Sequence, residues 1–361
     1  MNRRDFLRAT GGAATGLALP AGARETSYAQ GDGWRRFEVT KSVEVLKPSG
    51  TTRVWLPLPL TTDTPYQKTL GNTFQADGGT MSVRSDAAFA TGILTAEWPE
   101  GVKPALTMTC RVATRNYDAD LSQPGPSRGR DRASLAPFLR PTALIPTDGI
   151  VKATATEIVR GARTDLDKAR AIYEWIVANT FRDPKVRGCG TGDIRFMLES
   201  KNLGGKCADL NALYVGLARA SGLPARDVYG IRVAKSERGF KSLGAASENV
   251  TKSQHCRAEV HVRDYGWVPV DPADVRKVAL EEPPGNRPLD DELVRQARAR
   301  LFGSWEMNWM AYNYSHDVAL PGSKGPRIAF FMYPQCETAQ GRLDSLDADN
   351  FKYAIMAREI A

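Results

Sequence analysis

The chain has 361 residues, of which 42% are hydrophobic and 25% are charged. This balance is typical of globular proteins and excludes a chain that is mainly disordered, while the length leaves room for two domains. The formal net charge is +8, but basic residues are interspersed with acidic ones and no nucleic-acid-binding motif accompanies them. We therefore expect no nucleic-acid partner. The charge favours solubility, with contact to anionic cell-wall material as the alternative interpretation.

Residues 1–29 have the pattern of a twin-arginine export signal. The pair Arg3-Arg4 precedes a weakly apolar run over residues 9–23, and small residues follow where a signal would be cleaved. The run is too short and too rich in glycine to span a bilayer as a helix. The alternative is a disordered basic tail. We expect export to the periplasm or the medium, with no stable membrane insertion after removal of the signal.

Residues 30–121 are predicted to form an N-terminal β domain. Hydrophobic and polar residues alternate over residues 37–45 and again over residues 106–112, which is the period of a strand with one buried face. A further strand over residues 52–56 ends at Pro57. Turn residues separate these runs, so an antiparallel sheet or a small sandwich is expected.

A stretch rich in proline and glycine follows, and residues 122–148 are expected to form a linker. The pattern then becomes helical. Apolar residues recur at helical spacing over residues 150–160, and a second helix is expected after Thr164, which is a plausible N-cap. A third helix is expected to begin near Cys207 and to end at Ser221-Gly222.

A strand over residues 227–233 and a hairpin over residues 255–271 complete this second domain, which we expect to span residues 149–289. Residues 290–361 are expected to form a C-terminal extension. It contains a helical pattern near residues 291–301 and then an aromatic-rich stretch that favours β structure. The predicted fold class is therefore α+β, with an all-β domain in front.

Cys207 is the candidate nucleophile. The chain has five cysteines but no C-x-x-C pair and no zinc-binding spacing, so no metal and no cofactor are expected. At the start of a helix, the macrodipole and the free N–H groups favour a thiolate and could stabilise an oxyanion. Without this position, a buried and inert cysteine would be the simpler interpretation.

The hairpin supplies a candidate base, His255, and a candidate carboxylate, Asp271. If Val260 pairs with Val268, then Asp271 lies opposite Arg257 and is the diagonal neighbour of His255 on one face of the sheet. A slip of one residue would separate them. The alternatives are a histidine with a purely structural role and an aspartate that only forms the turn before Pro272.

Other residues fit these roles less well. Cys256 is adjacent to His255, but strand alternation turns it to the opposite, apolar face. His261 is expected opposite Trp267, away from the carboxylate. His316 has no carboxylate neighbour in the sequence beyond the next residue and is expected to be structural.

Three segments resemble the transglutaminase-like superfamily. They are GKCADL at residues 205–210 with LARASGLPAR at 217–226, HCRAEV at 255–260, and GWVPVDP at 266–272. The resemblance covers roughly residues 150–280 and implies a papain-like α+β core in which Cys207, His255 and Asp271 form a Cys-His-Asp triad. One departure is that Arg257 stands where bacterial members commonly carry tryptophan.

Together these patterns predict an exported, thiol-dependent acyl-transfer enzyme that hydrolyses peptide or amide bonds. Its substrate would be a peptide, a protein or a cell-wall amide. Arg257, Glu259 and Trp267 share the predicted face of the site and are expected to contact it. Protein-glutamine transamidation, which cross-links proteins, is one alternative. A non-catalytic peptide-binding or cell-wall-binding protein is the other.

Overall fold

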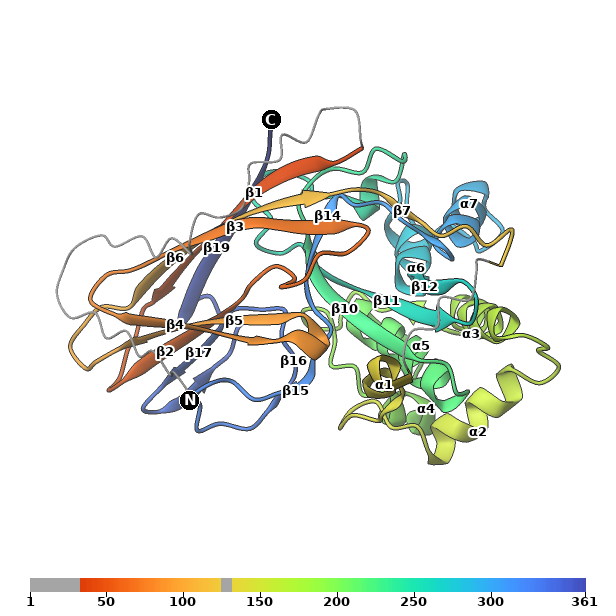
Figure 1. Ribbon diagram of the computed structural model, residues 1–361, viewed down its shortest axis with the longest axis horizontal. Helices are drawn as coiled ribbons and strands as arrows, with labels where there is room; N and C mark the ends of the chain where they lie inside the picture. The colour runs from red at the N-terminus through yellow and green to blue at the C-terminus, as the bar shows by residue number, and fades with distance from the viewer. Residues whose placement is uncertain (1–32, 125–131) are drawn as a thin grey trace, which may run out of the picture.

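The computed structural model describes residues 33–124 and 132–361. Over these residues the chain is α+β, as predicted. A β sandwich lies beside a part in which helices pack on a four-stranded antiparallel sheet (Figure 1). The expected export signal, residues 1–29, lies outside the described residues.

The sandwich consists of two antiparallel sheets whose inner faces share one core. Val43 and Met108 from one sheet pack in the same apolar cluster as Val54 and Leu94 from the other. The burial alternates along the first and sixth strands, as the sequence predicts. In spatial order the first sheet contains β19 (Phe351–Ile360), β1 (Arg35–Val45), β6 (Ala105–Thr114) and β3 (Gln67–Ala76). The second contains β18 (Gly341–Leu343), β17 (Gln335–Thr338), β2 (Thr52–Pro57), β5 (Thr91–Trp98) and β4 (Thr80–Asp86).

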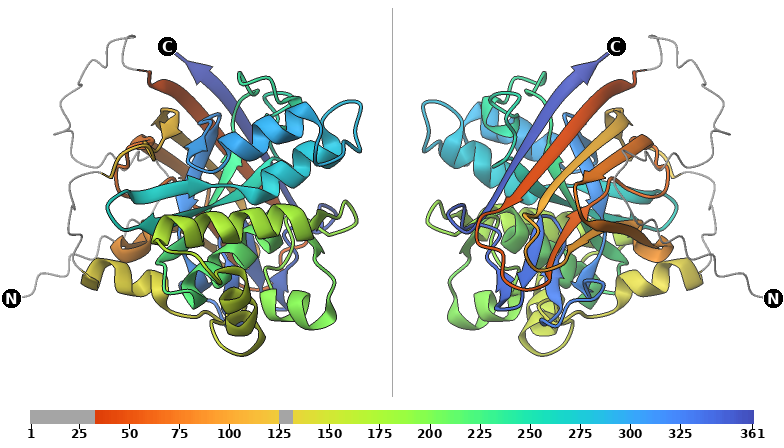
Figure 2. Two further views of the ribbon diagram at one scale, coloured as in Figure 1. Left: turned by 90° about the vertical axis from the view of Figure 1, so that its right-hand side faces the viewer. Right: turned by 90° about the vertical axis from the view of Figure 1, so that its left-hand side faces the viewer.

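The end of the chain completes this sandwich. Strand β19 pairs with β1 along its whole length, from Arg36 opposite Ile360 to Val45 opposite Phe351. Figure 2 shows these two strands side by side, although they stand at opposite ends of the sequence. Strand β17 likewise pairs with β2. Residues 290–361, expected as an extension, thus contribute strands to both sheets of the sandwich.

The helical part begins with the three helices that the sequence predicts. They are α2 (Gly149–Ile158), α3 (Asp165–Asn179) and α5 (Cys207–Ala220). Thr164 caps α3 through a reciprocal pair of bonds with Asp167, so the N-cap prediction is confirmed. All fourteen residues of α5 are buried, because it packs between other helices and the sheet. It is therefore the central helix of the domain.

The sheet beneath α5 has the order β12 (Gly266–Val270), β11 (Gln254–Val262), β10 (Ala225–Arg232) and β14 (Trp309–Asn313). The predicted register of the hairpin is confirmed, since Val260 pairs with Val268 and His261 with Trp267. The expectation that one face of this hairpin is not core is wrong. Both faces are buried, because an aromatic cluster that includes Trp305 and Trp309 covers the face away from α5.

Several elements have no counterpart in the sequence predictions. The most important is α6 (Pro272–Glu281), which begins where the hairpin ends. Phe138, in the expected linker, is buried, and its ring packs edge-on against that of Trp267. The described end of the linker segment therefore packs against the hairpin. The others are α1 (Arg132–Leu135), α4 (Ile194–Ser200), β8 (Phe181–Arg182) and β9 (Gly204–Gly205). The short strand β7 (Tyr117–Asp118) lies within the predicted β domain. The aromatic-rich stretch that favours β structure contains β13 (Ser304–Trp305), β15 (His316–Val318) and β16 (Ile328–Phe330). The predicted helix near residues 291–301 is α7 (Glu292–Arg300).

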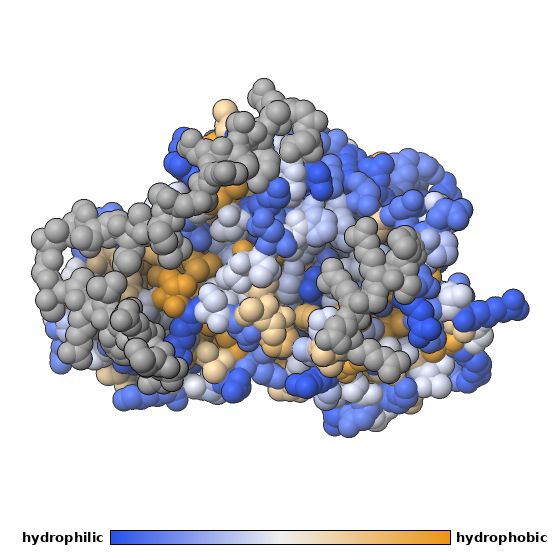
Figure 3. All heavy atoms as spheres, viewed as in Figure 1, coloured by the Kyte–Doolittle hydropathy of each residue, from blue (hydrophilic) through white to orange (hydrophobic). Residues whose placement is uncertain are grey.

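The surface has few extended apolar areas on the face shown in Figure 3. Hydrophilic side chains cover most of the visible surface that grey atoms leave open, and the most apolar patch lies over the sandwich. Among the helices of residues 33–124 and 132–361, none has both the length and the apolar character needed to cross a bilayer.

Candidate active site

Cys207 is the first residue of α5, as predicted, and only 4% of its surface is exposed. The helix start is fixed by Asp209, one turn into the helix. One carboxylate oxygen of Asp209 accepts a hydrogen bond from the backbone N–H of Lys206 at 2.9 Å. The other accepts bonds from the N–H groups of Thr191 and Gly192, each at 2.9 Å. Asp209 therefore holds the start of α5 against the loop between β8 and α4.

Two further thiols lie against Cys207. Cys189 comes from the loop between β8 and α4, and its carbonyl accepts a bond from the Ala208 N–H at 2.9 Å. Cys256 comes from β11 and is fully buried on the apolar face, as expected. That face packs against α5, however, so Cys256 lies close enough to Cys207 to lower the pKa of its thiol. Strand alternation places Cys256 and His255 on opposite faces of β11. Cys256 nevertheless lies beside Cys207, the candidate nucleophile.

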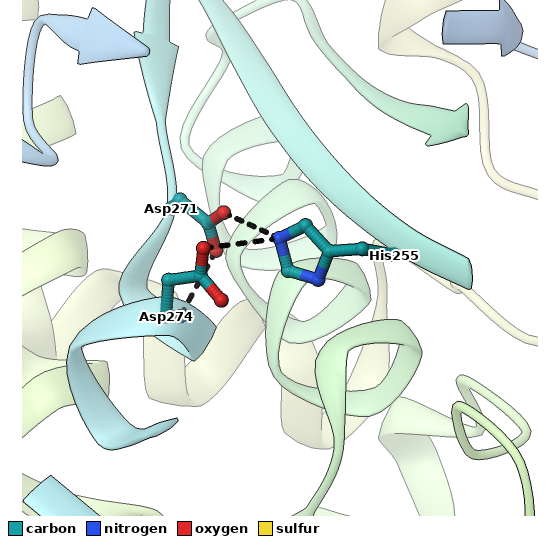
Figure 4. A group of neighbouring side chains, drawn as sticks. All are labelled: His255, Asp271 and Asp274. Carbon is teal, nitrogen blue, oxygen red and sulfur yellow. Dashed lines mark hydrogen bonds and ion pairs between the residues drawn. The ribbon is translucent and has the colours of Figure 1, made fainter. Parts of the chain in front are cut away.

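His255 and two carboxylates form the second half of the site. The His255 Nε2 atom lies 2.7 Å from Asp271 Oδ2 and 3.3 Å from Asp274 Oδ2 (Figure 4). The other ring nitrogen, Nδ1, points away from both carboxylates. The interaction of His255 with Cys207 lowers the pKa of the thiol, and Nδ1 is the ring nitrogen that the carboxylates leave free. The structure thus brings Cys207, His255 and Asp271 into one row.

The sequence left two roles open for Asp271, as the partner of His255 or as the residue that forms the turn before Pro272. In the structure Asp271 does both. Its Oδ2 atom holds His255, while its Oδ1 atom caps α6 by accepting a bond from the Asp274 N–H at 3.0 Å. The Asn211 side chain, which projects from α5, donates to the same Oδ1 atom at 3.3 Å. Because each oxygen has a separate partner, the carboxylate cannot rotate without breaking a bond. It fixes the imidazole in one orientation.

Asp274 and Arg232 belong to the site but were missed by the sequence predictions. Arg232 donates to both oxygens of Asp274, at 2.7 and 2.8 Å, and both residues are buried. Their pairing joins the end of β10 to the first turn of α6. The repeated aspartate in the sequence DPAD at residues 271–274 was the available signal, because a helix start is a favourable place for a second carboxylate.

The environment of Cys207 favours the thiolate. Hydrogen bonds from Cys189, from Cys256 and from His255 hold the pKa of Cys207 well below its ordinary value, although burial acts in the opposite direction. The pKa of Cys189 is raised by its hydrogen bond to Cys207 and by burial. Burial and the same neighbour raise the pKa of Cys256. Among the three adjacent thiols, Cys207 is therefore the one whose surroundings favour the thiolate, and it remains the candidate nucleophile.

The environment of His255 favours the imidazolium. Burial and the nearby Arg232 oppose a charge on the ring, but Asp274 and Asp271 outweigh them and raise the pKa of His255 to about 9. The two shifts together favour a thiolate beside an imidazolium. Such a pair supplies a nucleophile and a proton donor together.

A cavity of about 480 Å³ opens beside Cys207 and His255. Its walls come from loop residues 187–189 and 251–254, and from the aromatic side chains of Tyr333, Phe351 and Tyr353. Segments from three distant parts of the chain therefore enclose the space in which a substrate would meet the thiol.

The three expected substrate contacts, Arg257, Glu259 and Trp267, do not line this cavity. Glu259 is buried and bonded to Arg226 at 2.7 Å, and the guanidinium of Arg226 stacks 4.0 Å from the Trp267 ring. Arg257 lies over the ring of Trp309 at 4.7 Å and its Nε is 3.7 Å from the Asp271 carboxylate. We assign all three to the packing that supports the hairpin, and not to the substrate surface.

His255, Asp271 and Asp274 have ligand atoms within 4.8 Å of one another, which is a spacing that could hold a metal ion. Arg232 already binds both oxygens of Asp274, and the Arg257 guanidinium approaches Asp271. Each of the two carboxylates therefore already has a side-chain cation as a partner, in addition to the imidazole of His255.

The remaining histidines lie away from the cavity. His261 packs edge-on against Trp267, with ring centres 5.5 Å apart. His316 does have a carboxylate partner, contrary to the prediction from its sequence neighbours. Its Nε2 atom lies 3.2 Å from Asp227 Oδ2, which reaches it from β10.

Comparisons with known proteins identify a family and similar folds. Residues 152–272, which include Cys207, His255 and Asp271, match the model of the transglutaminase-like superfamily. A Haemophilus influenzae protein described as uncharacterized is 33% identical over 342 residues, covering 90% of this chain and 91% of the relative. The crystal structure of a candidate cysteine protease from Cytophaga hutchinsonii aligns with a TM-score of 0.50 and 16% identity, over 90% of this chain and 98% of that one. The periplasmic domain of TgpA from Pseudomonas aeruginosa aligns with a TM-score of 0.34 and 16% identity, over 66% of this chain and 94% of that one. The chain belongs to the transglutaminase-like superfamily.

Proposed function

We propose that this protein is a thiol-dependent acyl-transfer enzyme that hydrolyses peptide or amide bonds, with Cys207, His255 and Asp271 as its catalytic residues. The observation that carries the proposal is the opposite perturbation of two adjacent groups. The pKa of Cys207 is lowered while that of His255 is raised to about 9, and both line one cavity. A cysteine with a purely structural role does not require a lowered thiol pKa beside a histidine whose pKa is raised.

The proposed reaction has two steps. In the first, the Cys207 thiolate attacks the amide carbonyl carbon, and a C–S bond forms as the carbonyl becomes an oxyanion. The C–N bond then breaks, and the His255 imidazolium gives its proton to the leaving amine. In the second, His255 takes a proton from water, which attacks the thioester and releases a carboxylic acid and Cys207. Asp271 keeps the imidazole in place throughout.

The start of α5 supplies a donor for the oxyanion. The first N–H groups of a helix have no acceptor within the helix. For Cys207, the part of the chain that the structure describes contains no protein acceptor for this N–H. It therefore remains available to a substrate oxygen beside the thiol.

Mass spectrometry of peptide libraries incubated with the protein tests the proposal. Hydrolysis adds water across a bond, whereas transamidation joins an amine with loss of ammonia, so the two reactions leave different mass changes. We expect hydrolysed products that vanish in Cys207→Ala. Joined products would support the cross-linking alternative. Bound but unchanged peptides would contradict catalysis and favour a binding protein.

We also propose that the protein is exported to the periplasm or beyond, on the basis of Arg3-Arg4 and the weakly apolar run that follows. Replacing both arginines by lysine in a reporter fusion should stop export through the twin-arginine route. Unchanged export in the lysine variant, or export in a host without that route, would contradict the idea.

A further inference from the structure

The cavity beside Cys207 is lined by basic side chains and, among the residues the structure describes, by no carboxylate. This one-sided lining differs from the rest of the chain, where acidic and basic residues are interspersed. Since low-dielectric walls focus the field of such groups, the cavity should concentrate anions near the thiol. The basic lining residues are Arg182, Arg187, Lys206, Arg232, Lys252 and Lys277.

The three arginines are already neutralised. Arg232 is bonded to Asp274 through both of its oxygens. Arg187 pairs with Asp344, and Arg182 pairs with Glu281. Their guanidinium groups therefore add little net charge to the cavity.

The lysines are not balanced in this way. Lys277 has only Glu281, at 3.8 Å, which Arg182 already engages. Over residues 33–124 and 132–361, neither Lys206 nor Lys252 forms an ion pair. Lys206 directly precedes the nucleophile and is half-buried, while Lys252 is exposed on the loop that leads to His255. Two lysines that form no ion pair among the described residues thus line the cavity that holds Cys207 and His255.

We infer that this cavity selects an acyl donor that carries a carboxylate next to the scissile amide, such as a peptide with an acidic side chain or a free carboxyl terminus at that point. The inference rests on the proposed function. Lys206 and Lys252 are its specificity-determining residues. A carboxylate is favoured over a phosphate because the free groups are point-charge lysines, whereas the arginine forks that suit phosphate are occupied.

Alkylation of Cys207 tests the inference without requiring any hydrolysis. The sulfur displaces iodide from neutral iodoacetamide and from anionic iodoacetate, and the ratio of the two rates reports the potential in the cavity. A change in the fraction of Cys207 that is ionised alters both alkylation rates by the same factor, so it cancels in their ratio. We expect Lys206→Gln and Lys252→Gln each to lower the iodoacetate-to-iodoacetamide ratio about threefold, and the double variant about tenfold. The ratio should also fall as salt rises.

Lys47→Gln is the matched control. Lys47 is exposed in the turn after β1, does not line the cavity, and its loss changes the net charge by the same amount. We expect the iodoacetate-to-iodoacetamide ratio of Lys47→Gln to equal that of the parent chain. Equal ratios in all four variants and the parent would overturn the inference, as would a fall in Lys47→Gln as large as in the cavity variants.

Matched peptides then test the substrate class. We expect a peptide with glutamate beside the scissile amide to be cleaved at least about tenfold faster than its glutamine counterpart, through KM, with most of the preference lost in the double variant. Equal rates would overturn the inference while leaving hydrolysis in place, and faster cleavage of a phosphoserine peptide would do the same. If no peptide is cleaved at all, the proposed function fails, and the alkylation ratio still reports whether the cavity attracts carboxylates.

Discussion

The molecule contains two pairs of a histidine and a buried aspartate, and only one of them lies at the candidate active site. His255 pairs with Asp271 at 2.7 Å, and His316 pairs with Asp227 at 3.2 Å. In both pairs the aspartate is fully buried and contacts Nε2 of the ring. A histidine held by a carboxylate is therefore not enough to mark a catalytic site.

The surroundings separate the two pairs. The free nitrogen of His255 faces Cys207 and a cavity of about 480 Å³, whereas that of His316 lies 3.4 Å from the Tyr229 hydroxyl, and the cavity there measures only about 10 Å³. Asp271 receives hydrogen bonds on both oxygens. The oxygens of Asp227 receive none among the described residues. A fixed carboxylate, a thiol and open space distinguish the reactive pair.

Removing the nucleophile and the base should have the largest effect. We expect Cys207→Ala to abolish turnover of an amide substrate and His255→Ala to come close to it, because each is needed in both steps. Adding His255→Ala to Cys207→Ala should change almost nothing, since residues that act as a unit are not additive. His316→Ala is the control and should stay within a few-fold of the parent rate.

Rates on one amide substrate, with circular dichroism to confirm folding, check this set. Full activity in Cys207→Ala would end the proposed mechanism. Greater loss in His316→Ala than in His255→Ala would show that the second pair, and not the first, supplies the base.

Replacing each carboxylate by an amide sharpens the comparison. We expect Asp271→Asn to lower kcat about 100-fold, because it removes orientation and charge but keeps the base, and Asp274 still contacts the ring. The same chemical change at the other pair, Asp227→Asn, should alter kcat by less than about threefold. Equal losses in the two variants would mean that both act through stability, which thermal unfolding would reveal.

The pH dependence tests the electrostatic part of the site. The proton that His255 gives to the leaving amine is bound below its raised pKa of about 9 and is lost as the pH rises through that value. Asp274→Asn removes a charge that raises this pKa, so the alkaline limb of kcat/KM should move to lower pH by about one unit. Folding is checked first, because the change leaves Arg232 unpaired. An unmoved alkaline limb in a folded variant would contradict the role of Asp274.

The smallest expected effect concerns the neighbouring thiols that act on Cys207. Among the described residues, the pair of His316 and Asp227 has no such thiols beside it. Without the Cys189 hydrogen bond, the pKa of Cys207 should rise, so Cys189→Ala should slow iodoacetamide labelling of Cys207 several-fold near pH 6. Cys336→Ala, in the sandwich, is the control and should leave that rate unchanged. In the parent chain we expect Cys207 to be labelled before Cys189 and Cys256. Faster labelling of either neighbour would contradict the assignment.

Local patterns predicted the parts of the site that local geometry builds. Cys207 was placed at a helix start because Gly204-Gly205 interrupt the chain just before an apolar helical stripe. The hairpin register followed from matching two apolar faces with a period of two residues, so pairing Val260 with Val268 was enough to bring Asp271 to His255.

Contacts between distant segments were beyond such reasoning. Arg232 meets Asp274 only because β10 ends beside the first turn of α6. Asp227 meets His316 through strands that are far apart in the sequence. Arg257 was expected to contact substrate because its strand looked half-exposed, but Trp309, from the C-terminal region, covers that face. Periodicity along one strand carries no information about what packs over it.

The pairing of β19 with β1 has a consequence for the order in which the cavity is completed during synthesis. The candidate catalytic residues are all translated by Asp271, but Phe351 and Tyr353 of β19 form part of the cavity wall. The backbone of Ile355 also accepts a hydrogen bond from the N–H of Val250 at 2.8 Å, beside the loop that carries Lys252. Before β19 is translated, β1 can pair with β6 on one side only. We therefore expect the cavity wall to be complete only after β19 has been synthesised and has paired with β1.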